Sequence, residues 1–196
     1  MRKLSFSMLT SLDGYIDGPG GQDWVMADDE LHAFAAAQLR SADTLLFGRV
    51  TYELFAGYWP SAAANPANTP GEIDFANAIN DPRLEKIVFS RTLAAAAWQG
   101  QPLRLLRELA PADILALKQQ PGRDIVIAGA SIGSALARLG LLDEVEQLVH
   151  PVVLGSGKPM FDRLEQPLPL KLLRTQTLGS GVVVLTYRTT AAPLTA

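Results

Sequence analysis

The residue types and spacing best suited to chemistry lie in the segment Asp124–Leu136, which reads DIVIAGASIGSAL. Its first five residues are typical of a strand buried on both faces, and Gly129 ends that strand. A helix is expected to begin there, with Ser131 as its cap. Backbone N–H groups at a helix start lack partners and carry partial positive charge, so this turn is predicted to bind a pyrophosphate without a basic side chain. The residues expected to contact the phosphates are Gly129, Ala130, Ser131, Ile132 and Gly133.

Two other interpretations of the same turn remain open. Residues 129–133 match G-x-S-x-G, the nucleophile elbow of α/β-hydrolases, which would make Ser131 a nucleophile. The one histidine after it, His150, lies in an apolar run, and too little chain follows for the sheet that such a hydrolase needs. The glycine spacing also differs from the G-x-G-x-x-G dinucleotide fingerprint, which disfavours an ordinary Rossmann domain. The other alternative is a purely structural turn, in which the glycines allow the backbone conformation and no ligand binds.

Two more apolar runs lead into groups that bind anions. The first is followed by Gly48, Arg49 and Thr51, where another helix is expected to begin. The second is followed by Ser90 and Arg91. A guanidinium binds a phosphate monoester through two hydrogen bonds, and hydroxyls can satisfy the remaining oxygens. The sequence thus predicts three anion-binding points at strand ends along one edge of a sheet.

A glycine-rich segment near the start of the chain is the second region of interest. Residues 10–21 contain four glycines and a proline, which exclude a helix or an inner strand and predict either a mobile loop over a site or a surface turn. Asp13 lies in this loop. Trp24 follows it, where the ring could stack on a flat ligand or fill the edge of the core. Asp28 and Asp29 begin a helix, so capping explains these carboxylates, and proton transfer is the alternative.

Length and composition limit the classes of protein that fit. The 196 residues, of which 48% are hydrophobic, suit a single domain over residues 1–196. No cysteine and only two histidines argue against disulfides and a metal site. A net charge of -3 without a basic cluster argues against a nucleic-acid partner. No apolar run of about 18 residues occurs, so we expect a cytoplasmic protein with no membrane contact and a small-molecule substrate.

The elements that must position these residues follow from hydrophobic periodicity. Strands alternate with helices, which predicts an α/β fold with a mixed, mostly parallel central sheet flanked by helices and an antiparallel C-terminal hairpin. Pro151 in the apolar run 145–154 predicts an edge of the sheet or a bulge, and an apolar edge at 145–153 could pair two subunits as a homodimer. Strands are expected at 3–9, 44–47, 86–89, 103–106, 124–128, 145–154, 170–178 and 182–188, and helices from 28, from 48 and over 71–79, 111–120 and 129–140.

Five motifs occur in one order along nearly the whole chain. They read SLDG at 11–14, LFGRVTYE at 46–53, VFSR at 88–91, IAGAS at 127–131, and DEV with PVVLGSGKPMF between 143 and 161. This series resembles the dihydrofolate reductase-like family, and most closely the C-terminal reductase domain of the bacterial riboflavin-biosynthesis deaminase/reductase. Each motif is loose by itself. Their common order and spacing make the resemblance specific for the fold.

The resemblance implies NADPH as the cofactor. Residues 129–135 match the pyrophosphate loop of the family, and the motif around Gly48 matches the other side of the phosphates. Ser90 and Arg91 match the residues that hold the 2′-phosphate. The cofactor-binding residues that the resemblance implies are therefore Gly48, Arg49, Thr51, Ser90, Arg91, Gly129, Ala130, Ser131, Ile132 and Gly133.

The resemblance says less about the substrate. Asp13 and Trp24 would border the nicotinamide and the substrate, and Arg40 matches a basic position that suits an anionic group. The riboflavin pattern has an acid just before the pyrophosphate-loop glycine, and here Ile127 and Ala128 occupy that place. This departure argues against the ribityl-phosphate substrate of the riboflavin enzyme, whereas Arg40 leaves an anionic substrate open.

The resulting hypothesis is an NADPH-dependent reductase. It would transfer a hydride to a C=N or C=O group of a small pterin- or pyrimidine-like heterocycle, with a proton from Asp13, Asp28 or water. An NADPH-binding module without turnover is the first alternative. A serine hydrolase that uses Ser131 is the second.

Overall fold

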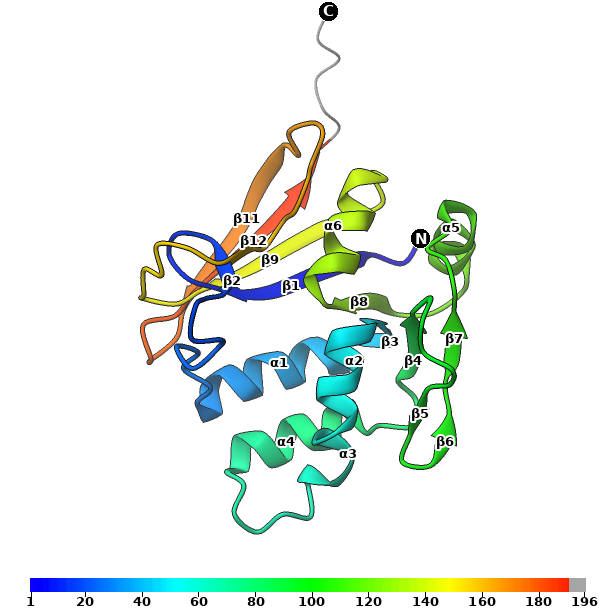
Figure 1. Ribbon diagram of the computed structural model, residues 1–196, viewed down its shortest axis with the longest axis horizontal. Helices are drawn as coiled ribbons and strands as arrows, with labels where there is room; N and C mark the ends of the chain where they lie inside the picture. Colours follow the sequence, from blue (N-terminus) through cyan, green and yellow to red (C-terminus); the bar gives the residue numbers. More distant parts are fainter. Residues whose placement is uncertain (191–196) are drawn as a thin grey trace, which may run out of the picture.

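The protein is built around one eight-stranded sheet, seen in a computed structural model that describes residues 1–190 (Figure 1). In chain order, its strands are β1 (Leu4–Thr10), β3 (Ala42–Gly48), β4 (Glu85–Phe89), β7 (Arg104–Leu106), β8 (Asp124–Ala128), β9 (Glu144–Val149), β11 (Leu170–Thr177) and β12 (Val183–Thr189). Their spatial order is β11-β12-β9-β1-β8-β3-β4-β7. The six strands from β9 to β7 run parallel, and β12 and β11 form an antiparallel hairpin beside them. The predicted mixed sheet is therefore confirmed.

Helices cover both faces of this sheet. They are α1 (Asp29–Ser41), α2 (Arg49–Ala56), α3 (Trp59–Ala62), α4 (Pro70–Ile79), α5 (Pro111–Gln119) and α6 (Ala130–Arg138). Figure 1 shows α5 and α6 on one side of the sheet and α1 with α4 on the other. Because side chains alternate along a strand, each strand contributes to two cores. Phe6 of β1 packs in the core under α5 and α6, whereas Leu45 and Phe47 of β3 pack in the core with α1 and α4.

The start of α1 and the start of α4 follow the usual capping chemistry. The Asp28 side chain accepts a hydrogen bond from the N–H of Leu31, and acids follow in the first turn of α1. Thr69 and Glu72 form a capping box at the start of α4. The predicted capping role of Asp28 is therefore confirmed.

Two sequence predictions about the strands were wrong. The expected loop 10–21 contains a short strand, β2 (Tyr15–Asp17), which pairs with β10 (Lys158–Pro159). The run 145–153 is no edge, because β9 ends at Val149 and lies between β1 and β12. Apolar residues occur there because both faces are covered, and the exposed edge of the hairpin is β11 instead.

The helices of residues 1–190 include none that is both long and apolar enough to cross a bilayer. Within the same residues, no three His, Asp or Glu side chains are grouped in a way that could hold a metal ion. Two short strands, β5 (Ala97–Trp98) and β6 (Gln101–Pro102), form a separate hairpin before β7.

Candidate functional site

Three neighbouring parallel strands end level with one another at one edge of the sheet. β3 lies between β8 and β4, and the last residues of the three strands are in register. Gly48, Gly129 and Ser90 lie at or directly after these ends, so the structure brings them side by side. In open α/β sheets, ligands bind at the carboxyl ends of the strands.

The turn at Gly129 has a backbone that requires glycine. Gly129 is buried, with φ 124° and ψ 126°. A Cβ atom at this position would lie 2.9 Å from Oγ1 of Thr51 and 3.6 Å from the backbone nitrogen of Gly48. The absence of a side chain therefore lets the first turn of α2 approach the first turn of α6.

The two helices that meet here leave their N-termini open to an anion. Gly48 is the N-cap of α2 and Gly129 is the N-cap of α6, and neither helix has a capping side chain or an acid in its first turn. α1 and α4, in contrast, have both. Unpaired N–H groups at two converging helix starts create a positive electrostatic potential without a competing carboxylate.

Ser131 was wrongly predicted to cap α6. The cap position belongs to Gly129, and Ser131 lies exposed in the first turn with its backbone N–H at the helix start. A hydrolase would also need a histidine beside Ser131. Nδ1 of His32 lies 2.9 Å from the carbonyl oxygen of Asp28, and Nδ1 of His150 lies 3.1 Å from that of Leu148. Neither histidine hydrogen-bonds to the serine, so the structure does not support the nucleophile elbow.

The remaining residues of the turn set its shape. Ala130 and Ile132 are buried, and a Cβ at Gly48 would lie 3.6 Å from Cγ1 of Ile132. At Gly133, a Cβ would lie 2.6 Å from the ring atoms of Phe6. Gly133 thus allows α6 to pack directly on β1, which fixes where the helix start lies.

The two arginines near this edge differ in their partners. The Arg49 guanidinium lies 2.7 Å from the Glu53 carboxylate one turn along α2. Arg91 is exposed and forms no ion pair within residues 1–190. Ser90 is buried, and its hydroxyl accepts hydrogen bonds from the N–H groups of Thr92 and Leu93 at 3.2 and 3.0 Å. Ser90 therefore shapes the turn that presents Arg91 to solvent.

Asp13 has a structural role that opposes proton donation. Its carboxylate accepts hydrogen bonds from the Ser11 hydroxyl at 2.7 Å and from the N–H groups of Leu154 and Gly155 at 3.1 and 2.7 Å. These bonds, led by that of the Ser11 hydroxyl, lower the pKa of Asp13 below its usual value. A carboxylate held in this way is a poor acid, and it fixes the loop after β9 to the loop after β1.

Trp24 and Asp28 lie near a residue that the sequence did not identify as part of a site. The Trp24 ring meets the His150 ring edge to face, with centroids 5.2 Å apart. His150 directly follows β9 and is completely buried. The charge of Asp28 acts on the same imidazole. The only signal in the sequence was a polar ring in an apolar run before Pro151.

Arg40 lies far from this cluster. It pairs with Asp74 of α4, with Nη1 3.0 Å from Oδ2, and the pair is exposed to solvent. The pairing lowers the pKa of Asp74. Arg40 and the cap Asp28 are at opposite ends of α1, about 18 Å apart at 1.5 Å per residue. The structure therefore does not bring Arg40 to the substrate region as the sequence predicted.

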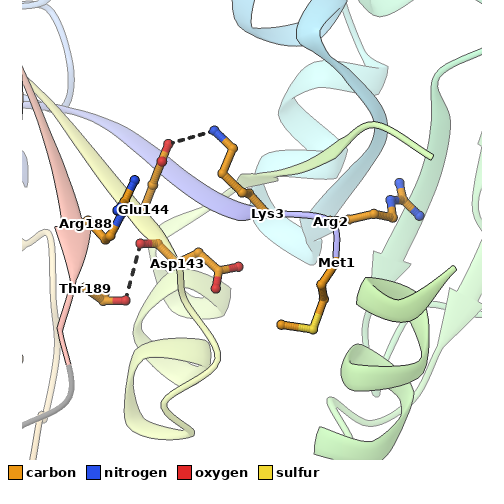
Figure 2. Close-up of a pocket in the computed structure, with 7 residues that line it drawn as sticks. All are labelled: Met1, Arg2, Lys3, Asp143, Glu144, Arg188 and Thr189. Carbon is orange, nitrogen blue, oxygen red and sulfur yellow. Dashed lines mark hydrogen bonds and ion pairs between the residues drawn. The ribbon is translucent and has the colours of Figure 1, made fainter. Parts of the chain in front are cut away.

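Two hollows lie away from the carboxyl edge. Figure 2 shows one of about 300 Å³ at the amino ends of β1 and β9, where Lys3 points toward Glu144. Its charges are largely paired, since Lys3 lies 3.2 Å from Glu144 and Asp143 lies 2.7 Å from Lys118. The other, of about 310 Å³, lies between α1 and the sheet. There Glu146 accepts hydrogen bonds from neighbouring side chains.

Comparisons with known proteins show the family and the fold of this chain. The model of the RibD C-terminal domain family matches residues 2–184. The uncharacterized protein YyaP of Bacillus subtilis is 33% identical over 188 residues, which cover 95% of this chain and 94% of that protein. A putative riboflavin biosynthesis protein from Shewanella has a similar structure, with a TM-score of 0.71, 21% identity and coverage of 97% and 100%. Dihydrofolate reductase from Enterococcus faecalis, solved with NADP(H), has a TM-score of 0.58, 15% identity and coverage of 96% and 97%.

Proposed function

Because the chain belongs to the RibD C-terminal domain family, we propose that it is an NADPH-dependent reductase of a small heterocycle. The substrate would be a pterin- or pyrimidine-like ring that accepts a hydride at a C=N or C=O carbon. NADPH would supply that hydride when bound. The protein would bind and orient both molecules and exclude water from them. The observation that carries the proposal is the meeting of two uncapped helix starts at Gly129.

The residues at this edge fit the diphosphate of a dinucleotide. The N–H groups of the first turn of α6 and of α2 would donate to its oxygens, and the hydroxyl of Thr51 lies between the two turns. Gly129 leaves the space that a Cβ would fill. Arg49 would offer its guanidinium from the exposed start of α2.

Arg91 is the residue that we assign to the 2′-phosphate. It is exposed at the end of β4, two strands from β8, and forms no ion pair within residues 1–190. Arg91→Ala should weaken NADPH binding by about tenfold or more, because a charge-assisted pair contributes about 1.5–3 kcal/mol, and should leave NADH binding nearly unchanged. Fluorescence titration with both nucleotides tests this. Equal loss for both would remove the assignment.

The proton is proposed to come from water or from Asp28, since Asp13 is held as a carboxylate. Asp28 is exposed near Trp24, but its Oδ1 caps the N–H of Leu31 at 2.8 Å. An Asp28→Asn variant would keep an oxygen for the cap. If it retains the wild-type rate of NADPH oxidation, water is the donor.

A binding module without turnover is the second candidate. Asp13 and Asp28 both accept hydrogen bonds from backbone N–H groups. Both carboxylates therefore have structural roles, which favours a protein that binds NADPH without turnover. The two candidates differ in one measurement, the loss of absorbance at 340 nm when NADPH is mixed with pterins, pyrimidinones and dihydrofolate. Binding without oxidation across that panel would favour the module.

The homodimer expected from the sequence is proposed to form through β11. All eight residues of this edge strand are exposed, including Leu170, Leu172 and Leu173 at 40%, 49% and 40%. An exposed apolar edge strand is a common site of strand pairing between chains. Light scattering of the wild type should give twice the mass of one chain. The Leu172→Lys variant should have the mass of a single chain.

A further inference from the structure

His150 is held rigidly at the carboxyl end of β9. Its backbone N–H donates to the carbonyl of Thr10 at 2.7 Å, which ties it to the end of β1. Its side chain is completely buried, with the Trp24 ring beside it and the charge of Asp28, at the start of α1, acting on it. The strand order places β9 two strands from β8. At about 4.8 Å per strand, β9 lies about 10 Å across the sheet from β8. The pairs Phe6–Ile127 and Thr10–Val149 show that β9 also extends past the end of β8, so His150 lies beyond the level of Ala128.

The two ring nitrogens of His150 have different roles. Nδ1 lies 3.1 Å from the carbonyl oxygen of Leu148, which can only accept, so Nδ1 carries the proton. Burial lowers the pKa of His150, so the ring is neutral near pH 7 and Nε2 has a free lone pair. No group within residues 1–190 hydrogen-bonds to Nε2, although it is completely buried. A buried acceptor without a donor is costly unless a ligand satisfies it.

Trp24 covers this imidazole. Its ring meets His150 at 89°, and its Nε1–H donates to the carbonyl of Gly21 at 3.1 Å. Trp24 is only half-buried and lies directly after the glycine-rich segment. That segment is held locally by hydrogen bonds between Gly18 and Gly21. Because His150 is completely buried under Trp24, contact between Nε2 and a flat molecule at the edge of β1 requires Trp24 to move with this segment.

We propose that Nε2 of His150 accepts a hydrogen bond from a ring N–H of the substrate and so selects heterocycles that carry a lactam N–H. This inference rests on the proposed reductase function and adds a specificity-determining residue to it. Trp24 would then lie against the ring of the bound molecule. A ring whose nitrogens are methylated would leave the Nε2 lone pair without a donor and would bind more weakly.

The test is NMR of the imidazole nitrogens in protein labelled with ¹⁵N-histidine. The chain has two histidines, so His32→Phe and His150→Phe assign both signals, and His32 is an internal control on α1. The probes are uracil and 1,3-dimethyluracil, which share a ring and differ in their N–H groups. Each is added to the full-length protein with and without saturating NADP⁺.

We expect uracil to move the Nε2 signal of His150 toward that of a hydrogen-bonded nitrogen, and dimethyluracil to leave it unchanged. His150→Phe, which keeps an aromatic ring against Trp24, should bind uracil about tenfold more weakly while NADPH affinity stays at the wild-type value. The proposal would be overturned if uracil left the Nε2 chemical shift of His150 unchanged, or if both probes changed it equally. Failure of the wild type to bind NADPH would instead contradict the proposed function, because the arm without nucleotide still reports on His150.

Discussion

Replacement of Gly129 by alanine addresses the turn on which the proposed cofactor site depends. A residue with a Cβ at φ 124° and ψ 126° is strained by about 1–3 kcal/mol. The added Cβ would also lie 2.9 Å from Oγ1 of Thr51, and overpacking of this kind costs about 1–3 kcal/mol. Together these effects predict that Gly129→Ala lowers the free energy of unfolding by about 2–6 kcal/mol.

Gly140→Ala is the matched control at the other end of the same helix. Gly140 also has a positive φ, 65°, but a Cβ there would meet nothing within 4 Å. Its replacement should therefore cost about 1–2 kcal/mol of backbone strain alone. A second control, Thr51→Ala, removes the crowding oxygen, so the cost of Gly129→Ala should be smaller in that background.

Urea unfolding and NADPH fluorescence titration are the two assays. Gly129→Ala should weaken NADPH by at least about tenfold, because the new methyl group separates the two helix starts, while Gly140→Ala should bind NADPH like the wild type. If Gly129→Ala binds NADPH normally, the helix starts at this turn do not hold the diphosphate. If both glycine variants lower the free energy of unfolding equally, the contact between the added Cβ and Thr51 does not contribute to the loss.

Three further changes test other parts of the account. The amides of Leu154 and Gly155 donate hydrogen bonds to the Asp13 carboxylate, so Asp13→Asn should speed hydrogen exchange at both amides. Unchanged exchange would mean that Asp13 does not fix this loop. Burial lowers the pKa of Lys86 to about 8, so the unfolded chain holds that proton more tightly. Stability should rise from pH 8 to 10.5, and Lys86→Met should abolish this rise and stabilise the protein at pH 7 by about 1–3 kcal/mol in urea unfolding. Burial also lowers the pKa of His150, so stability should fall as the pH drops below about 6.5, and an equal fall in His150→Phe would show that another group causes it.

The sequence predicted the order of the elements well, because buried parallel strands and amphipathic helices leave distinct apolar periods. Residues 124–128 were identified as a strand and Gly129 as its end, and the structure has both there. The resemblance to the dihydrofolate reductase-like family was also confirmed. The residues at the ends of β8, β3 and β4 could be placed together because parallel strands must end at one edge.

The parts that the sequence could not predict depend on contacts between distant segments. β2 and β10 are too short to leave a period and form only because they pair across more than a hundred residues. Pro151 led to the prediction that β9 is an edge strand, but the strand ends before that proline. The N–H groups that hold the Asp13 carboxylate belong to Leu154 and Gly155 on another loop, so the sequence alone left open that Asp13 acts as an acid. His150 could be identified as a candidate site residue only from its contact with Trp24 in the structure.

The most direct test of the central claim is a backbone amide ¹H–¹⁵N titration of the wild-type protein with NADPH. We expect the amide signals of Ala130, Ser131, Ile132 and Thr51 to shift strongly and to saturate together with the change in NADPH fluorescence. Absence of binding, or saturating shifts confined to residues elsewhere in the fold, would contradict it.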